Sequence, residues 1–173
     1  MRLIFTIIMA TMLVISTIES SEAGFLYHAT KRAAANRIMR SGFTKSHMNP
    51  SSRFGAKAYL ANKPSNAFRE RPGADTVLRF KSNGNLNKKL IDTRRMKTAD
   101  LKTISGRNDM RGTTKHGIIG PKLGHDIGRN AEKNNSIIAY RSAKVPHSTN
   151  YAIPEKSYKN SAMLKPDKIM NVN

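Results

Sequence analysis

The stretch from Leu26 to Glu70 limits the possible folds more than any other part of the chain. It opens with a short apolar strand that ends at His28, continues into a basic helix, and returns through a polar loop. The turn Ser52-Arg53-Phe54-Gly55 then leads into a second short strand that carries Tyr59. Because a histidine at the end of one strand and a tyrosine after a glycine-containing turn can face one cleft, this stretch predicts a binding site between its two strands.

Local patterns give the boundaries of the expected elements. Aromatic and apolar residues favour a strand over Gly24–Thr30, and a helix over Lys31–Ser41 follows with Thr30 as its N-cap. Gly42 suits the left-handed position after that helix, and Thr44–Ser52 is expected to form a surface loop over the cleft. Further strands are expected at Lys57–Ala61, Asp75–Lys81, Lys89–Asp92, Ile137–Tyr140 and Thr149–Ile153, with a turn over Ser82–Asn87 and helices starting at Pro64 and spanning Thr98–Ser105.

Two segments lack a clear periodic pattern. Gly106–His125 is rich in glycine and predicts a long irregular segment, which in a compact domain is usually a functional or mobile loop. Lys156–Asn173 is expected to be a weakly structured tail. The order of elements is strand, helix, strand, helix and then several strands, which predicts an α+β fold without internal repeats.

The first residues have the pattern of a signal peptide. Arg2 gives a short positive start, Leu3–Ile18 is an almost unbroken apolar run, and Ser21-Glu22-Ala23 offers small residues at a cleavage site. We therefore expect a signal peptide at residues 1–23, a domain at residues 24–155 and the tail at residues 156–173. The protein is then secreted, and an uncleaved membrane anchor is the alternative.

The composition is strongly basic and free of cysteine. The chain has 31 Lys and Arg against 11 Asp and Glu, a formal net charge of +20, and no cysteine. Such a charge attracts anionic partners such as nucleic acid, membrane or cell wall, and it also serves simply to keep a protein soluble. The basic residues are spread along the chain and no zinc spacing is present, so no DNA-reading element is indicated. Without disulfides, stability must come from one core, and we expect a monomer.

Three features of the stretch from Leu26 to Glu70 carry a resemblance to a known family. Tyr27-His28-Ala29-Thr30, a helix that closes with Gly42-Phe43, and the run from Phe54 to Tyr59 resemble the nicotinamide-binding half of ADP-ribosyltransferases with the His-Tyr-Glu pattern. The resemblance implies a split antiparallel β-sheet with short flanking helices, and NAD as the substrate. It also implies that His28 donates a hydrogen bond to a ribose hydroxyl and that Tyr59 stacks on nicotinamide. The other residues implied in NAD binding are Ala29, Thr30, Ser52, Arg53 and Gly55, with Ala29 replacing the usual glycine.

The glutamate of that pattern has no direct counterpart. In this family it begins a strand that corresponds here to Asn135–Tyr140, and its position holds Ser136. Glu132 lies just upstream and substitutes only if the strand begins earlier. The segment from Tyr140 to Pro154 is instead similar to the RES-type NAD-degrading toxins. That second resemblance implies Ser142 as the active-site serine and Glu70 as the helix glutamate.

Three functions remain open at this point. The chain is expected to be a secreted mono-ADP-ribosyltransferase-like toxin or effector, a RES-like NAD glycohydrolase, or a non-catalytic basic protein on the same fold. A transferase needs an acceptor, which would be a protein or a nucleic acid. The basic segment between Lys81 and Lys133, including Arg94, Arg95 and Arg107, is a hypothetical contact for that acceptor or for an anionic surface.

Overall fold

The structure, a computed structural model, describes residues 24–82, 86, 89–111, 114–115, 117–145, 147–160 and 164–171. The signal peptide predicted for residues 1–23 and most of the turn predicted for residues 82–87 lie outside these residues. The strands are β1 (Phe25–Thr30), β2 (Ala58–Ala61), β3 (Thr76–Ser82), β4 (Leu90–Asp92), β5 (Thr114–Lys115), β6 (Ile118–Ile119), β7 (Ile137–Tyr140), β8 (Asn150–Ile153) and β9 (Leu164–Asn171). The helices are α2 (Arg32–Ser41), α3 (Pro64–Glu70), α4 (Thr98–Ser105), α5 (Pro121–Asn134) and α6 (Glu155–Asn160), with a short 3-10 helix η1 (Lys45–His47).

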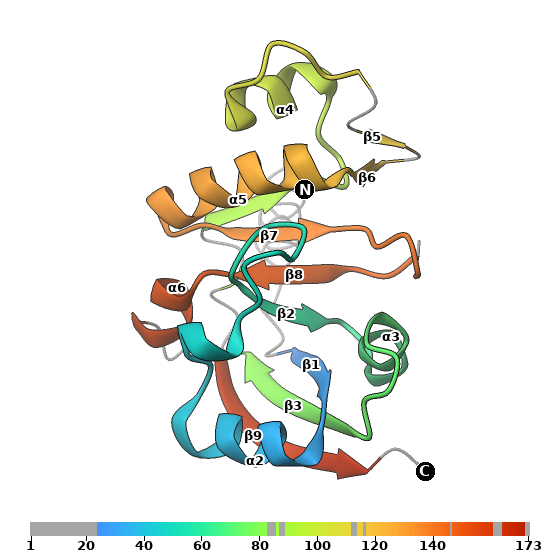
Figure 1. Ribbon diagram of the computed structural model, residues 1–173, viewed down its shortest axis with the longest axis vertical. Coiled ribbons are helices and arrows are strands. Elements are labelled where there is room, and N and C mark those ends of the chain that lie inside the picture. Colours follow the sequence, from blue (N-terminus) through green and yellow to red (C-terminus); the bar gives the residue numbers. More distant parts are fainter. Residues whose placement is uncertain are drawn as a thin grey trace, which may run out of the picture.

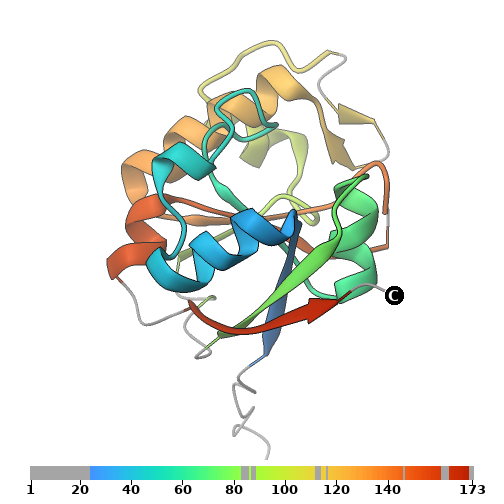
Figure 2. The same ribbon diagram turned by 60° about the horizontal axis from the view of Figure 1, so that its bottom comes forward.

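The described residues form an α+β domain. Seven strands make one mixed sheet in the order β4-β7-β8-β2-β1-β3-β9, and β5 and β6 form a separate hairpin. Only the β4–β7 pair in this sheet is parallel. The sheet runs from the side of α5 to the side of α2 (Figure 1), and α2 covers the end formed by β3 and β9 (Figure 2). The predicted fold class is confirmed, and each predicted strand lies within one residue of its expected bounds.

The sheet opens at its centre, between β1 and β2. β1 pairs with β3 at every position from Phe25 to Thr30, and β2 pairs with β8 along its whole length. Between β1 and β2, by contrast, the only paired position is Tyr27 with Ala61. The half-sheets β4-β7-β8-β2 and β1-β3-β9 are therefore joined at one paired position, in agreement with a split sheet. The prediction of a fully antiparallel sheet is wrong for the β4–β7 pair, which is parallel.

Helix α2 confirms one part of its prediction and corrects another. Its apolar face buries Ala35 and Ile38 in the core, and Gly42 after its end has a positive φ of 71°. The predicted Thr30 N-cap is wrong, because Lys31 holds that position and its side chain makes no capping hydrogen bond. Thr30 is instead buried in β1, where it pairs with Thr76. Thr30 therefore belongs to β1 and does not cap α2.

The segment predicted as irregular contains a long helix. Residues 106–125 include the β5–β6 hairpin and the start of α5, so the prediction of a continuous loop is wrong. Pro121 occupies the first turn of α5, where its missing N–H costs nothing, and the helix continues for 14 residues. Leu123, Ile127 and Ala131 are fully buried at intervals of four residues, which places them on one helix face. Gly124 belongs to this same buried face, whereas Gly106 ends α4 and Gly117 lies in the hairpin turn, both with positive φ.

The described part of the C-terminal segment forms a helix and a strand, so the prediction of a weakly structured tail is wrong there. Residues 156–173 contain most of α6 and all of β9, which pairs antiparallel with β3 from Thr76 to Ser82. From α6, Tyr158 packs edge-on against Phe43 at 5.4 Å between ring centroids. β9 is an edge strand that contains Lys165, Pro166, Asp167 and Lys168, residues that protect a sheet edge and weaken the strand signal in the sequence.

Three clusters of buried side chains form the interior. The first surrounds Phe43 and Phe80 between α2 and the sheet, the second lies under α5, and the third is rich in alanine and lies under α3. In the part of the chain that the structure describes, no helix is long and apolar enough to cross a membrane.

Candidate functional site

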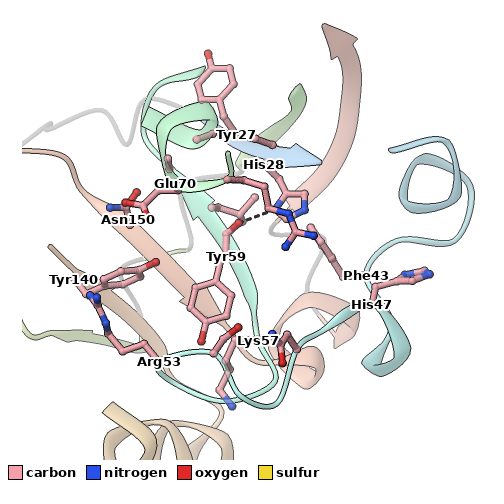
Figure 3. A pocket seen from close by; sticks show the side chains of 17 residues that line it. Tyr27, His28, Phe43, His47, Arg53, Lys57, Tyr59, Glu70, Tyr140 and Asn150 are labelled. Carbon is pink, nitrogen blue, oxygen red and sulfur yellow. Dashed lines mark hydrogen bonds between the residues drawn. The ribbon is translucent and has the colours of Figure 1, made fainter. Parts of the chain in front are cut away.

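A pocket of about 280 Å³ lies where the two half-sheets diverge. Its walls come from β1, β2, α3, β7, β8 and the loop between α2 and β2, and Figure 3 shows the side chains that line it. The volume is near the lower end of small-molecule sites, which are about 300–1,000 Å³. The lining residues used below are Tyr27, His28, Ala29, His47, Ser52, Arg53, Lys57, Tyr59, Ala61, Glu70, Arg71, Tyr140 and Asn150.

His28 spans the opening between the half-sheets. Its Nδ1 lies 2.8 Å from the backbone carbonyl oxygen of Tyr59. Because a carbonyl can only accept, Nδ1 carries the proton and Nε2 is left as an acceptor in the neutral ring. Burial, opposed by the Tyr59 carbonyl and reinforced by the nearby Arg71 cation, lowers the pKa of His28 from 6.5 to about 4. The ring is therefore neutral at pH 7 and Nε2 is available as an acceptor, which differs from the donor role expected from the sequence.

Tyr59 is held rigidly in the pocket wall. Its hydroxyl donates to the carbonyl of Gly55 and accepts from the backbone N–H of Phe54, both at 2.9 Å. The ring stands edge-on to that of Tyr140, with centroids 6.3 Å apart. Burial raises the pKa of Tyr59 to about 12, so it stays protonated. An aromatic surface fixed at its hydroxyl suits stacking against a ligand ring and leaves the hydroxyl no role in proton transfer.

The loop Ser52–Gly55 owes its position to α5. A Cβ atom at Gly128 would overlap the carbonyl oxygen of Phe54, and one at Gly124 would overlap that of Arg53. Two glycines one helical turn apart thus let the loop backbone lie directly on the helix. Arg53 in turn reaches the Tyr140 ring at 5.9 Å. Helix α5 therefore supports the pocket wall without lining it.

Glu70, at the end of α3, is the only acidic residue among those that line the pocket. Its Oε1 is buried and has no hydrogen-bond partner among the described residues. It also forms no ion pair there, although basic residues are abundant and most other described carboxylates are paired. Burial and the charge of Glu70 both raise the pKa of Tyr140, which indicates that the carboxylate lies close to that hydroxyl. A partly buried carboxylate without a protein donor is a group suited to a ligand.

Asn150 is a pocket residue that the sequence analysis missed. It begins β8, is 1% exposed, and its Oδ1 has no partner in the described chain. The pairing of the sheet places Tyr140, Asn150, Ala61 and Tyr27 in one row across four strands. The available signal was a polar residue at the start of the apolar strand Thr149–Ile153, but its neighbours in the row are distant in sequence.

Two basic residues at the pocket, Arg71 and His47, were also missed. Arg71 follows α3 and is exposed, and its charge acts on His28. His47 of η1 borders the pocket from the loop that was predicted to cover the cleft. Both are compatible with an anionic ligand group near the opening. An arginine directly after a helix has no distinctive pattern in a sequence this basic.

The structure brings some predicted residues together and not others. His28, Ala29, Ser52, Arg53, Tyr59 and Glu70 all line the pocket. Thr30, Gly55 and Ser142 are not among its lining residues. Gly55 nevertheless contributes the carbonyl that holds Tyr59, whereas Ser142 is 2% exposed and accepts a hydrogen bond from the Lys144 backbone N–H at 3.2 Å.

Glu132 does not take the place of the family's glutamate, which was expected at the start of β7. The strand starts at Ile137, as predicted, and Glu132 lies in α5. Its carboxylate is 2.5 Å from Nζ of Lys57, whose side chain is only 5% exposed. Glu132 therefore neutralises a buried ammonium and is not available to the pocket.

No group of three or more potential metal ligands occurs among the described residues. Comparison of the sequence with known proteins gives no matching family model, and the curated proteins give no match either.

Proposed function

We propose that this chain is an ADP-ribosyltransferase-like domain that binds NAD and cleaves the bond between nicotinamide and ribose. The observation that carries the proposal is the buried, unpartnered carboxylate oxygen of Glu70 in a pocket shared with His28 and Tyr59. A secreted toxin or effector is the setting that the predicted signal peptide favours. The residues with the proposed roles come from both half-sheets, so only the folded domain assembles them.

The proposed reaction breaks the C1′–N bond, and nicotinamide leaves with the bonding electron pair. Positive charge then develops on the ribose, and a carboxylate beside it stabilises that charge more in the transition state than in the ground state. Glu70 has this role in the proposal. Tyr59 holds the nicotinamide ring, and Nε2 of His28 is an acceptor for another donor group of the ligand. The acceptor nucleophile forms the new bond to C1′ and loses its proton to Glu70 or to water.

Water is the second candidate acceptor, which would make the protein an NAD glycohydrolase. The observation favouring this alternative is that Glu70 is the sole lining carboxylate, so none remains to orient a macromolecular nucleophile. In this version Ser142 has no contact with substrate, because it is buried outside the pocket lining. Its predicted role as an active-site serine is therefore not part of the proposal.

A macromolecular acceptor, if there is one, would approach a basic surface. Arg94 and Arg107 are paired with Asp92 and Asp126, respectively, so they are weaker candidates for this contact than the sequence suggested. Arg95 and Lys102 are exposed and in no described ion pair. The basic segment contributes no residue to the pocket, so acceptor binding and NAD cleavage are separable.

Incubation with NAD labelled in its adenylate part tests the proposal. Release of nicotinamide with label fixed on a protein or nucleic acid indicates a transferase, and release with free ADP-ribose indicates a glycohydrolase. Glu70→Gln should abolish either activity, whereas Glu155→Gln, which alters a surface carboxylate paired with Lys159, should not. A folded wild-type protein that neither binds nor consumes NAD would leave only the non-catalytic alternative.

A further inference from the structure

Two buried acceptor atoms in the pocket have no donor. They are Oε1 of Glu70 and Oδ1 of Asn150, and they are the two unpartnered buried side-chain polar atoms in the described residues. Both residues line the same pocket, and Figure 3 draws them at the same end of it. Burying an acceptor without a partner destabilises the fold, so two such atoms in one pocket indicate a ligand that brings donors.

The orientation of the Asn150 amide follows from its neighbours. The Ser148 hydroxyl donates its only hydrogen to the carbonyl of Val145 at 2.8 Å, so it can only accept from Asn150. The Asn150 Nδ2 group makes that contact at 2.9 Å. Oδ1 must then face away from Ser148. Ser148 and Asn150 are both nearly fully buried, so Ser148 is a positioning residue that keeps an acceptor in the pocket.

We infer that Glu70 and Asn150 together bind the two hydroxyl groups of the nicotinamide ribose, an inference that rests on the proposed function. A ribose carries two O–H donors on adjacent carbons, which matches two acceptors at one end of a pocket. The catalytic role of Glu70 requires the ribose at that end, because the positive charge of the reaction develops on the sugar. Asn150 then favours substrates that carry the ribose hydroxyl it contacts. Glu70 binds the other hydroxyl and stabilises the positive charge that develops on the ribose.

The nicotinamide carboxamide is a weaker match to these two atoms. Its amide nitrogen is a donor, but its carbonyl is a third acceptor and would require a donor of its own. A carboxylate placed at the carboxamide would also lie away from the carbon that becomes positive, and it would not lower the barrier. The amide thus belongs at the other end of the pocket, near Tyr59.

Calorimetric binding of an uncleavable NAD analogue, with a methylene in place of the ribose ring oxygen, tests the inference. The same analogue is prepared without its 2′- or its 3′-hydroxyl, and each form is titrated into the wild type and Asn150→Ala. In the wild type, loss of the hydroxyl that meets Asn150 should weaken binding about tenfold, as expected for one buried hydrogen bond. In Asn150→Ala the parent analogue should bind about tenfold more weakly, and loss of that hydroxyl should then cost less than twofold.

Two further variants test whether Ser148 acts by orienting the Asn150 amide or only by stabilising the fold. Ser148→Ala should weaken the parent analogue but not the form lacking that hydroxyl, and Asn134→Ala on the exposed end of α5 should change neither. If Asn150→Ala does not fold, the wild type alone still decides, because equal affinity for all three analogues overturns the inference. A further analogue carries nicotinic acid in place of nicotinamide. If the wild type binds the three hydroxyl variants equally but no longer binds the nicotinic acid analogue, the two acceptors contact the carboxamide, which also overturns the inference. Absence of any binding to the wild type would defeat the proposed function itself.

Discussion

Two glutamates near the pocket have opposite surroundings. Glu132 on α5 meets a buried Lys57 at 2.5 Å, in a region where glycines let the helix lie directly on the loop backbone. Glu70 at the end of α3 has a buried oxygen without a partner, and Asn150 beside the same pocket has another. We call these the closed region, around α5, and the open region, around Glu70 and Asn150.

This comparison distinguishes a carboxylate that stabilises the fold, Glu132, from one that is left to bind a ligand, Glu70. A buried ion pair loses much of its Coulomb energy to desolvation, and removing one partner leaves the other uncompensated, so the closed region is expected to matter for folding. An unpartnered acceptor destabilises the fold until a ligand arrives, so the open region is expected to matter for binding. Each substitution below is a test of that division, ordered by the size of its expected effect.

Gly128→Ala should be the most damaging change. The added Cβ would overlap the carbonyl of Phe54, and because both partners are backbone, the helix and the loop would have to separate. We expect a loss of about 3 kcal/mol or more in the free energy of unfolding, measured by chemical denaturation. Lys133→Ala on the exposed side of α5 is the control and should change little. Wild-type stability for Gly128→Ala would show that α5 does not support the loop as described.

Glu70→Gln should have the largest effect on function. The amide keeps the shape of the side chain and removes the negative charge that the proposed transition state requires. We expect nicotinamide release to fall about 100-fold or more, comparable to the loss of one well-placed electrostatic group. Rates are to be compared at saturating NAD, so that weaker binding is not mistaken for slower cleavage. If Glu70→Gln releases nicotinamide at the wild-type rate, Glu70 has no catalytic role.

Acidification should destabilise the protein through His28. Its pKa is lowered from 6.5 to about 4 in the folded state, so the unfolded chain binds the proton more readily. The stability due to the neutral ring is therefore complete above pH 6.5 and is lost as the pH falls towards 4. At pH 5 the loss should be about 2 kcal/mol. His28→Gln cannot titrate, so its unfolding free energy should vary less between pH 7 and pH 5, and an equal slope in both proteins would contradict this assignment.

Glu132→Gln should have the smallest effect of the four. It leaves the Lys57 ammonium without its partner, but Glu132 is 38% exposed and water can partly replace it. We expect a loss of about 1 kcal/mol in stability, reduced from the value for a fully buried pair. Nicotinamide release per folded molecule should remain close to wild type. A large loss of activity without loss of stability would make Glu132 the missing acid.

The sequence predicts the open region better than the closed one. His28 and Tyr59 were expected to face one cleft, and a direct hydrogen bond links the His28 ring to the backbone of Tyr59. Those residues lie in short strands with local signals on both sides. The unpartnered state of Glu70 was not predictable, because it depends on which of many basic residues come near it in the folded chain.

Part of the closed region was misread because the start of α5, with Gly124, was included in the segment Gly106–His125 that was predicted to be irregular. Gly124 and Gly128 lie on the buried face of α5 with Leu123 and Ile127, so they serve packing and not chain reversal. Including them in the apolar pattern, with Pro121 as a helix start, would have revealed the helix. β9 was missed for a different reason, since the run Lys165-Pro166-Asp167-Lys168, which suits a sheet edge, does not alternate between apolar and polar residues.

Thermal unfolding of the wild type and Glu70→Gln, each with and without saturating NAD, tests the central claim most directly. If Glu70 is left unpaired for a ligand, Glu70→Gln without NAD should melt at the wild-type temperature or above it, because no native contact of the carboxylate is lost. Its NAD-induced rise in melting temperature should be much smaller than that of the wild type. A variant that melts several degrees lower without NAD, yet keeps the full NAD-induced rise, would show that Glu70 is structural and contradict the account.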